Sequence, residues 1–238
     1  MAKKIGLGVL ALIIVFVIIV ARQPATFSVE RSAEIAAPQA VVFDLVADFK
    51  QFAIWSPWSK LDPAMKQTYS ESTTGLGATY EWSGNDEVGG GKMTVTETQP
   101  PAIHTTRLDF TAPVTSTAMT GFKVEAAGEG TKVTWWMKGD NDFMGKAFGL
   151  FMDMDRMIGD SYETGLANVG TLAKAQVEAR AKADTEARAQ AAELAKAAAA
   201  ARAKAEADAE AAAATAMAAA AEAMATAEAA AAASSRVK

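Results

Sequence analysis

Hydrophobic and polar positions divide the 238-residue chain into three stretches with different patterns. Residues 5–21 are an unbroken run of apolar residues and glycine, and residues 23–170 mix alternating runs with helical repeats. Residues 171–238 are mostly alanine and charged residues. Only the middle stretch has the variety of side chains that a packed core requires, because a core is filled by large apolar residues in a regular pattern. The pattern predicts an apolar segment over 1–22, a globular domain over 23–170 and a helical extension over 171–238.

The middle stretch predicts an α+β domain. Pro38 and the apolar residues that follow it predict a short amphipathic helix, which Trp55-Ser-Pro-Trp58 ends. Residues 143–172 predict a terminal helix, broken near Asp153. Alternation with a period of two predicts seven strands, over residues 26–36, 66–72, 77–83, 92–98, 103–110, 115–126 and 131–138. These elements predict a curled antiparallel sheet, connected as a meander, that wraps around the long terminal helix.

Four motifs carry a resemblance to a known family. They are Trp55-Ser-Pro-Trp58, Tyr80-Glu-Trp-Ser-Gly84, Gly130-Thr-Lys-Val-Thr-Trp135 and the tract from Gly145 to Leu166. Together they resemble the membrane-anchored, polyketide cyclase/dehydrase-like members of the SRPBCC superfamily, over about residues 25–174. The resemblance implies the helix-grip fold of START domains and the birch pollen allergen, with a ligand pocket between sheet and helix. It implies no particular reaction, since this fold hosts carriers, receptors, cyclases and hydrolases.

The alternation also predicts which side chains face the helix. Six of the positions predicted to face inward are Met93, Val95, Leu108, Val124, Val133 and Met137. These residues could instead simply fill a solid core. The candidate ligand-binding residues are Tyr80, Trp82, Phe110, Phe122 and Trp135 on the strands, with Phe151 and Met154 on the helix.

One pair of residues suggests catalysis. If residues 99–102 form a four-residue hairpin loop, Thr98 pairs with Ile103 and Glu97 lies opposite His104. A carboxylate beside an imidazole could act as a general base. A surface pair near a turn is the alternative interpretation, and a register shift of one residue would separate the two side chains.

Composition excludes several classes of function. The domain carries 11 Lys and Arg against 19 Asp and Glu, and an acidic surface repels nucleic acid. With one histidine and no cysteine, neither a zinc site nor a disulfide is expected, and no motif indicates a metal or another cofactor. Asp140-Asn-Asp142 begins like a calcium loop, but Met144 and Phe151 replace two oxygen ligands, so we interpret it as a helix-capping loop.

The apolar run over residues 5–21 is short for a membrane span and long for the core of a signal peptide. We favour an uncleaved transmembrane anchor, because the residues before Ala21 make a poor cleavage site. Lys3 and Lys4 precede the run and only Arg22 follows it. The positive-inside rule then predicts a single-pass protein of the bacterial inner membrane, with the N-terminus in the cytoplasm and the domain in the periplasm.

The alanine-rich stretch predicts a helix that continues for about 60 residues, roughly 90 Å, past the domain. Oppositely charged residues four apart, such as Glu178 with Lys182, support it. Disorder is the alternative. Leu194, Met217 and Met224 are too few for a conventional coiled coil, so the helix is either solitary or packed through alanine against a second helix or a partner.

The leading hypothesis for function is a membrane-tethered domain that binds a hydrophobic small molecule or lipid. The second is an enzyme of the cyclase, dehydratase or hydrolase type that uses Glu97, His104 and Tyr80. The third is a scaffold subunit of a membrane complex, in which the anchor and the alanine-rich helix are the working parts.

Overall fold

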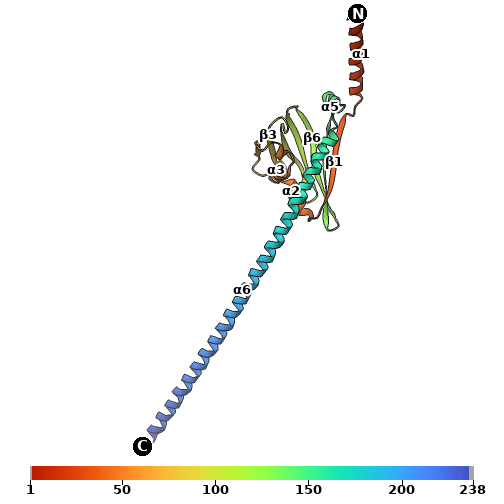
Figure 1. Ribbon diagram of the computed structural model, residues 1–238. Helices are drawn as coiled ribbons and strands as arrows, with labels where there is room; N and C mark the ends of the chain where they lie inside the picture. The colour runs from red at the N-terminus through yellow and green to blue at the C-terminus, as the bar shows by residue number, and fades with distance from the viewer. Residues whose placement is uncertain (1, 236–238) are drawn as a thin grey trace. The chain divides into compact units, whose positions relative to one another are not determined.

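The structure of the protein is a computed structural model that describes residues 2–235 (Figure 1). Seven strands form one antiparallel sheet in the order β1-β7-β6-β5-β4-β3-β2. Their bounds are Thr26–Ile35 (β1), Lys66–Tyr69 (β2), Thr79–Ser83 (β3), Gly90–Gln99 (β4), Ile103–Ala112 (β5), Ser116–Ala127 (β6) and Gly130–Asp140 (β7). Strands β2 to β7 form the predicted meander. β1 pairs with β7 at the far edge, with Arg31 opposite Trp135.

Three short helices connect β1 to β2. α2 (Gln39–Ala47) follows Pro38, and α3 (Phe49–Trp55) begins at a new cap, where the Asp48 carboxylate accepts a hydrogen bond from the Lys50 amide. α4 (Trp58–Leu61) completes the connection. The sequence predicted one helix in this region, and the cap at Asp48 divides it into α2 and α3.

The terminal helix is broken where the sequence predicted. α5 (Phe143–Phe148) and α6 (Met154–Ser235) are separated by five residues. The Asp142 carboxylate accepts from the Gly145 amide at 2.7 Å, and the Asp153 carboxylate accepts from the Arg156 amide at 3.0 Å. Residues 140–142 therefore form the helix-capping loop that the sequence indicated.

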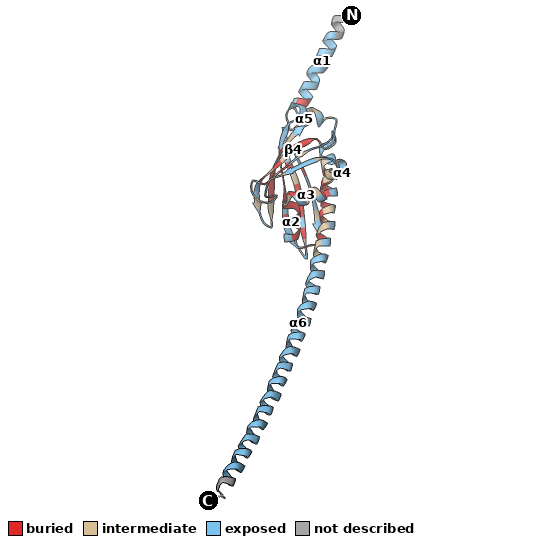
Figure 2. Cartoon of the chain, turned by 90° about the vertical axis from the view of Figure 1, so that its left-hand side faces the viewer, coloured by how far each residue is buried: buried red, intermediate tan, exposed pale blue. Residues whose placement is uncertain are grey.

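The first turns of α6 pack on the inner face of the sheet. Tyr162, Leu166, Val169 and Ala173 are buried at spacings of three and four residues, the pattern of one helix face. On the neighbouring face, Arg31 of β1 reaches the carboxylates of Asp155 at 3.0 Å and Glu163 at 3.1 Å. Sheet and helix thus form the predicted α+β helix-grip arrangement, and the core lies between them (Figure 2).

The chain divides into two compact units, residues 1–179 and residues 180–238. Within the second unit, α6 is helical through Ser235, and its described side chains are exposed. The predicted pair of Glu178 with Lys182 is wrong: Glu178 pairs with Lys174, and Lys182 pairs with Glu186, each at 4.0 Å. Such exposed pairs contribute little to stability, so alanine is the main support of the helix.

α1 (Ala2–Ala21) is the helix formed by the apolar run. Among the described residues, no helix is both long enough and apolar enough to cross a membrane. The structure therefore does not support the transmembrane anchor predicted over residues 5–21.

Candidate functional site

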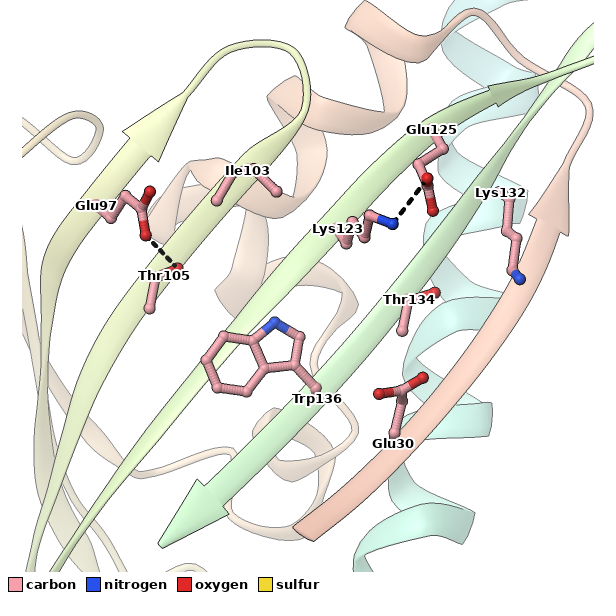
Figure 3. A pocket seen from close by; sticks show the side chains of 9 residues that line it. All are labelled: Glu30, Glu97, Ile103, Thr105, Lys123, Glu125, Lys132, Thr134 and Trp136. Atoms are coloured by element: carbon pink, nitrogen blue, oxygen red, sulfur yellow. Dashed lines mark hydrogen bonds and ion pairs between the residues drawn. The ribbon is translucent and has the colours of Figure 1, made fainter.

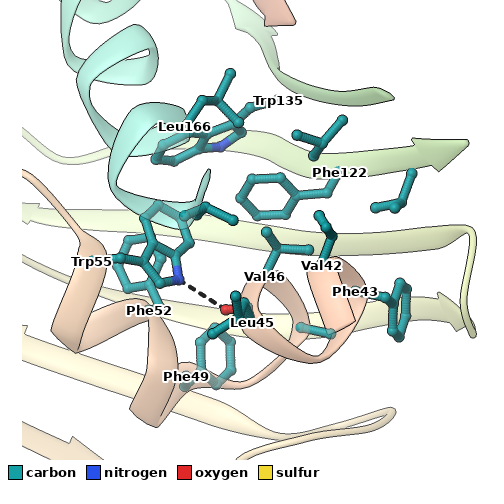
Figure 4. Close-up of a cluster of buried hydrophobic side chains, with 14 of the residues drawn as sticks. Val42, Phe43, Leu45, Val46, Phe49, Phe52, Trp55, Phe122, Trp135 and Leu166 are labelled. Atoms are coloured by element: carbon teal, nitrogen blue, oxygen red, sulfur yellow. Dashed lines mark hydrogen bonds between the residues drawn. The ribbon is translucent and has the colours of Figure 1, made fainter. Parts of the chain in front are cut away.

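The inner face of the sheet is lined by aromatic side chains from several strands. Tyr80 of β3, Phe122 of β6 and Trp135 of β7 are buried there, as the alternation predicted. α2, α3 and the start of α6 supply the opposite wall (Figure 4). Six further positions predicted to face inward are also buried: Met93, Val95, Leu108, Val124, Val133 and Met137. We call the packed region between these walls the grip interior.

Trp135 is the centre of the aromatic contacts. Its ring stacks on Tyr162 of α6, with centroids 3.8 Å apart and an angle of 5° between the planes. Trp55 contacts it edge-on at 5.2 Å and Phe122 lies at 5.1 Å. The Trp135 indole donates a hydrogen bond to the Thr120 hydroxyl at 3.2 Å. These contacts hold helix α6 on the sheet and satisfy the polar atom of the indole.

Tyr80 begins a second set of aromatic contacts that runs toward the edge of the sheet. It lies 5.9 Å from Phe49 and 5.8 Å from Trp82, which contacts Phe110 edge-on at 6.0 Å. Burial raises the pKa of the Tyr80 phenol, so this group stays protonated. Trp82 and Phe110 are half-buried, and the Trp82 indole donates to the Val88 carbonyl at 3.0 Å.

His104 of β5 is a titratable residue buried in the grip interior. Only 2% of its surface is exposed, and it lies between Phe49 at 6.4 Å and Phe122 at 6.5 Å. Burial lowers its pKa to about 4, so the imidazole is neutral at pH 7. Its Nδ1 atom is buried without a hydrogen-bond partner among the described residues, as is the hydroxyl of Ser56. Buried polar atoms normally have partners, so these two are positions where a ligand or water would bind.

The predicted pairing of Glu97 with His104 is wrong. Glu97 pairs with Thr105, and His104 pairs with Thr98, because the register shifts between Val95 and Glu97. A β-bulge at this point turns Glu97 to the outer face of the sheet, where its carboxylate accepts from Gln99 at 2.7 Å. His104 points into the grip interior. The two side chains lie on opposite faces and cannot act as a dyad.

The predicted closure by Phe151 and Met154 is also wrong. Phe151 is 78% exposed and Met154 is 37% exposed. Burial along α6 rises from Met154 through half-buried Ile158 to buried Tyr162. The helix therefore meets the sheet one to two turns later than predicted, and Tyr162 provides the contact with the interior.

Two hollows lie on the outer face of the sheet, one on each side of Trp136. The first has a volume of about 520 Å³ and a charged rim (Figure 3), which includes Glu30, Lys123 and Glu125. The second has a volume of about 630 Å³ and includes Phe27 and Met119. The first suits a polar ligand and the second an apolar one, and neither includes a residue that the sequence predicted to bind the hydrophobic ligand.

Sequence reasoning missed the helical half of the grip interior. Phe49, Phe52 and Tyr162 all face it, and Phe52 contacts Tyr80 edge-on at 5.9 Å. The apolar spacing from Val41 to Phe49 indicated the buried face of a helix but not its partner in the sheet. Among residues 2–235, no group of three potential ligands could hold a metal ion.

The chain belongs to a known protein family. A family model described as "Polyketide cyclase / dehydrase and lipid transport" matches residues 26–174, more than half of the chain. This confirms the predicted membership of the SRPBCC superfamily, whose helix-grip fold is a hydrophobic ligand-binding fold. No curated protein matches the chain.

Several solved structures are similar in part. The chain is 15% identical to protein CV1439 from Chromobacterium violaceum, with a TM-score of 0.46 over 63% of this chain and 97% of that one. It is 18% identical to protein Ms6760 from Mycobacterium smegmatis, with a TM-score of 0.46 over 63% and 92%. The major latex-like protein 151 from Panax ginseng is 12% identical, with a TM-score of 0.44 over 62% and 97%.

Proposed function

We propose that the domain binds a hydrophobic small molecule or lipid in the grip interior. The observation that carries this proposal is the buried, unpartnered Nδ1 atom of His104, which lies between Phe49 and Phe122 in an aromatic interior. A binding site for a hydrophobic ligand is mostly apolar and has a few polar groups that orient the ligand. A neutral imidazole suits such a ligand because it binds a hydroxyl, amine or carbonyl without burying a charge.

The test uses N-phenyl-1-naphthylamine, an apolar fluorescent probe with one N–H group. The His104→Phe substitution keeps a ring between Phe49 and Phe122 but removes the ring nitrogens. We expect it to weaken binding of the probe roughly tenfold. A tenfold change in affinity corresponds to about 1.4 kcal/mol, which is within the range for the loss of one buried hydrogen bond. The thermal midpoint should stay the same or rise, because a buried unpaired atom is removed.

The control is Trp136→Ala, which changes both outer hollows and leaves the grip interior intact. Binding of the probe should be unchanged in this variant. If Trp136→Ala weakens binding and His104→Phe does not, the ligand binds on the outer face and the proposal is wrong.

We propose that α1 attaches the domain to a membrane. Eleven large apolar side chains of α1, between Leu7 and Ile19, are exposed to solvent, an arrangement that is costly in water. Lys3 and Lys4 precede the apolar residues, and basic residues beside an apolar helix are attracted to anionic lipid headgroups.

The attachment is tested by flotation of the full chain with phospholipid vesicles. Wild type should float, and Ile14→Arg should float much less, since an arginine in the middle of an apolar helix costs roughly 2.5 to 3.5 kcal/mol. Leu194→Arg, a control at an exposed position of α6, should float like wild type. Equal flotation of wild type and Ile14→Arg would contradict attachment through α1.

We propose that the second unit, residues 180–238, binds another protein or a second copy of itself. The described side chains of this unit are exposed, including Leu194, Met217 and Met224. Alanine side chains allow two helices to approach closely. Sedimentation of the full chain and of a chain that ends at Ala179 should show a larger species only for the full chain. A monomer in both cases would exclude self-association and leave an external partner.

A further inference from the structure

Between β7 and the buried part of α6, the chain exposes an unusual number of large apolar side chains. Seven of the fifteen residues in this segment are large, apolar and exposed: Phe143, Met144, Phe148, Phe151, Met152, Met154 and Met157. We call them the 143–157 surface. Exposed apolar residues scattered singly are normal, but a continuous group of this kind marks a binding surface.

Two hydrogen bonds join a residue shortly before α5 to the segment that follows α1. The Asn141 amide donates to the Ala25 carbonyl at 2.8 Å, and the Asn141 side chain donates to the Pro24 carbonyl at 3.3 Å. α1 ends at Ala21, so only four residues separate it from β1, and four residues span about 14 Å at most. α1 and α5 also contact each other. Whatever surrounds the end of α1 therefore also meets the 143–157 surface.

The charges of the segment are compatible with a lipid surface. Four acidic residues lie in the segment or directly before it: Asp142 and Asp153 cap helices, Asp155 pairs with Arg31, and Asp140 is exposed. Arg22 and Lys146 supply positive charge close to the apolar residues. A long basic side chain reaches phosphate groups while its methylene stem lies against apolar surface.

We propose that the 143–157 surface inserts into the interface between headgroups and acyl chains of the bilayer that receives α1. This proposal rests on the proposed attachment through α1. The domain would then have a defined orientation on the membrane, with the start of α6 in contact with lipid. Because the same helix covers the grip interior through Tyr162, an apolar ligand could pass between the bilayer and the domain near this end of α6.

The test measures the depth of single positions in the membrane. The natural chain has no cysteine, so a single introduced cysteine can carry a nitrobenzoxadiazole dye. Phe151→Cys places the dye on the 143–157 surface, and Leu76→Cys places it on an equally exposed loop residue, since these side chains are 78% and 74% exposed. The labelled full chains are mixed with vesicles of phosphatidylcholine and phosphatidylglycerol that contain lipids with a spin label near the headgroup.

We expect both labelled proteins to float with the vesicles. The dye at Phe151→Cys should lose roughly half of its fluorescence to the spin label, because interfacial side chains lie about 5 to 10 Å below the surface. The dye at Leu76→Cys should lose none. Phe148→Cys repeats the measurement at a second position of the surface, so the result does not depend on the folding of one variant.

Three results would overturn the proposal, and they are distinguishable. If the labelled chains float but the dye at Phe151→Cys and Phe148→Cys is not quenched, insertion of the 143–157 surface is wrong and attachment through α1 stands. If the labelled chains do not float, both the insertion and the attachment through α1 are wrong. If the dye becomes shielded from water as the protein concentration rises, whether or not lipid is present, a second copy of the chain covers this surface instead.

Discussion

His104 combines nearly complete burial with an unpartnered ring nitrogen, in a chain that contains no other histidine. Leaving a buried polar group unpaired costs about 1 to 3 kcal/mol, so a purely structural residue at this position would be apolar. The neighbouring strand positions confirm the contrast, since Phe122 opposite His104 is apolar and buried. The cost is explained if a ligand supplies the missing partner.

Burial of His104 also predicts a pH dependence of stability. The pKa of the imidazole falls from 6.5 to about 4 on folding. Between these values the unfolded chain binds the proton and the folded chain does not, so the free energy of unfolding decreases as the pH falls from 6.5 toward 4. Above pH 6.5 both states are neutral and the effect is absent. The full effect is about 3 kcal/mol.

Urea unfolding of wild type and His104→Phe across this range measures the effect. The variant should gain stability relative to wild type as the pH falls below 6.5, while the difference stays constant above it. Carboxylates titrate in both chains and cancel in the comparison. If the free energies of unfolding of wild type and His104→Phe change with pH in the same way over the whole range, His104 takes up its proton in the folded state as readily as in the unfolded state.

Among the elements, α6 comes close to the sheet at Gly165. A Cβ atom on this residue would lie 2.7 Å from the Trp135 ring and 3.2 Å from the Trp55 ring, closer than packed atoms normally approach. Both rings belong to the aromatic centre of the domain. The absence of a side chain at Gly165 therefore allows the helix to dock.

This contact predicts opposite effects for two glycines of one helix. Gly165→Ala should destabilise the domain by about 1 to 3 kcal/mol, because it overpacks the contact with Trp135. Gly170→Ala should stabilise it by up to about 1 kcal/mol, since its nearest neighbour, Ile35, is 3.8 Å away and alanine favours helix. Thermal unfolding monitored by circular dichroism measures both. Similar midpoints for the two variants would contradict the close docking of α6.

The sequence predicted the elements better than their pairing. Alternation identified every strand, because one face of the sheet is buried and the other is not. It did not reveal the bulge between Val95 and Glu97, where the extra residue, Thr96, is compatible with either face. The predicted pairs Met93 with Leu108 and Val95 with Thr106 are confirmed, and the register is wrong by one residue from Glu97 onward. This one-residue error is what placed Glu97 opposite His104 in the predicted catalytic dyad.

At the scale of the whole molecule, the sequence predicted a helical alanine-rich extension and a helix-grip fold. The alanine-rich extension is helical, and the helix-grip domain is confirmed by its sheet order and by the family match over residues 26–174. The grip interior was only half predicted, because Phe49 and Phe52 meet Tyr80 and His104 through contacts between elements far apart in the sequence. Periodicity describes the faces of elements and carries no information about which faces meet.

The central claim, that a hydrophobic ligand binds in the grip interior, is tested most directly by locating the bound probe. Nuclear Overhauser effects between N-phenyl-1-naphthylamine and the methyl-labelled full chain report which side chains lie beside it. We predict contacts with Val95, Leu108 and Val124 on the inner face, together with a changed His104 ring signal. Contacts confined to Ile103 and Met119, which line the outer hollows, would contradict the claim.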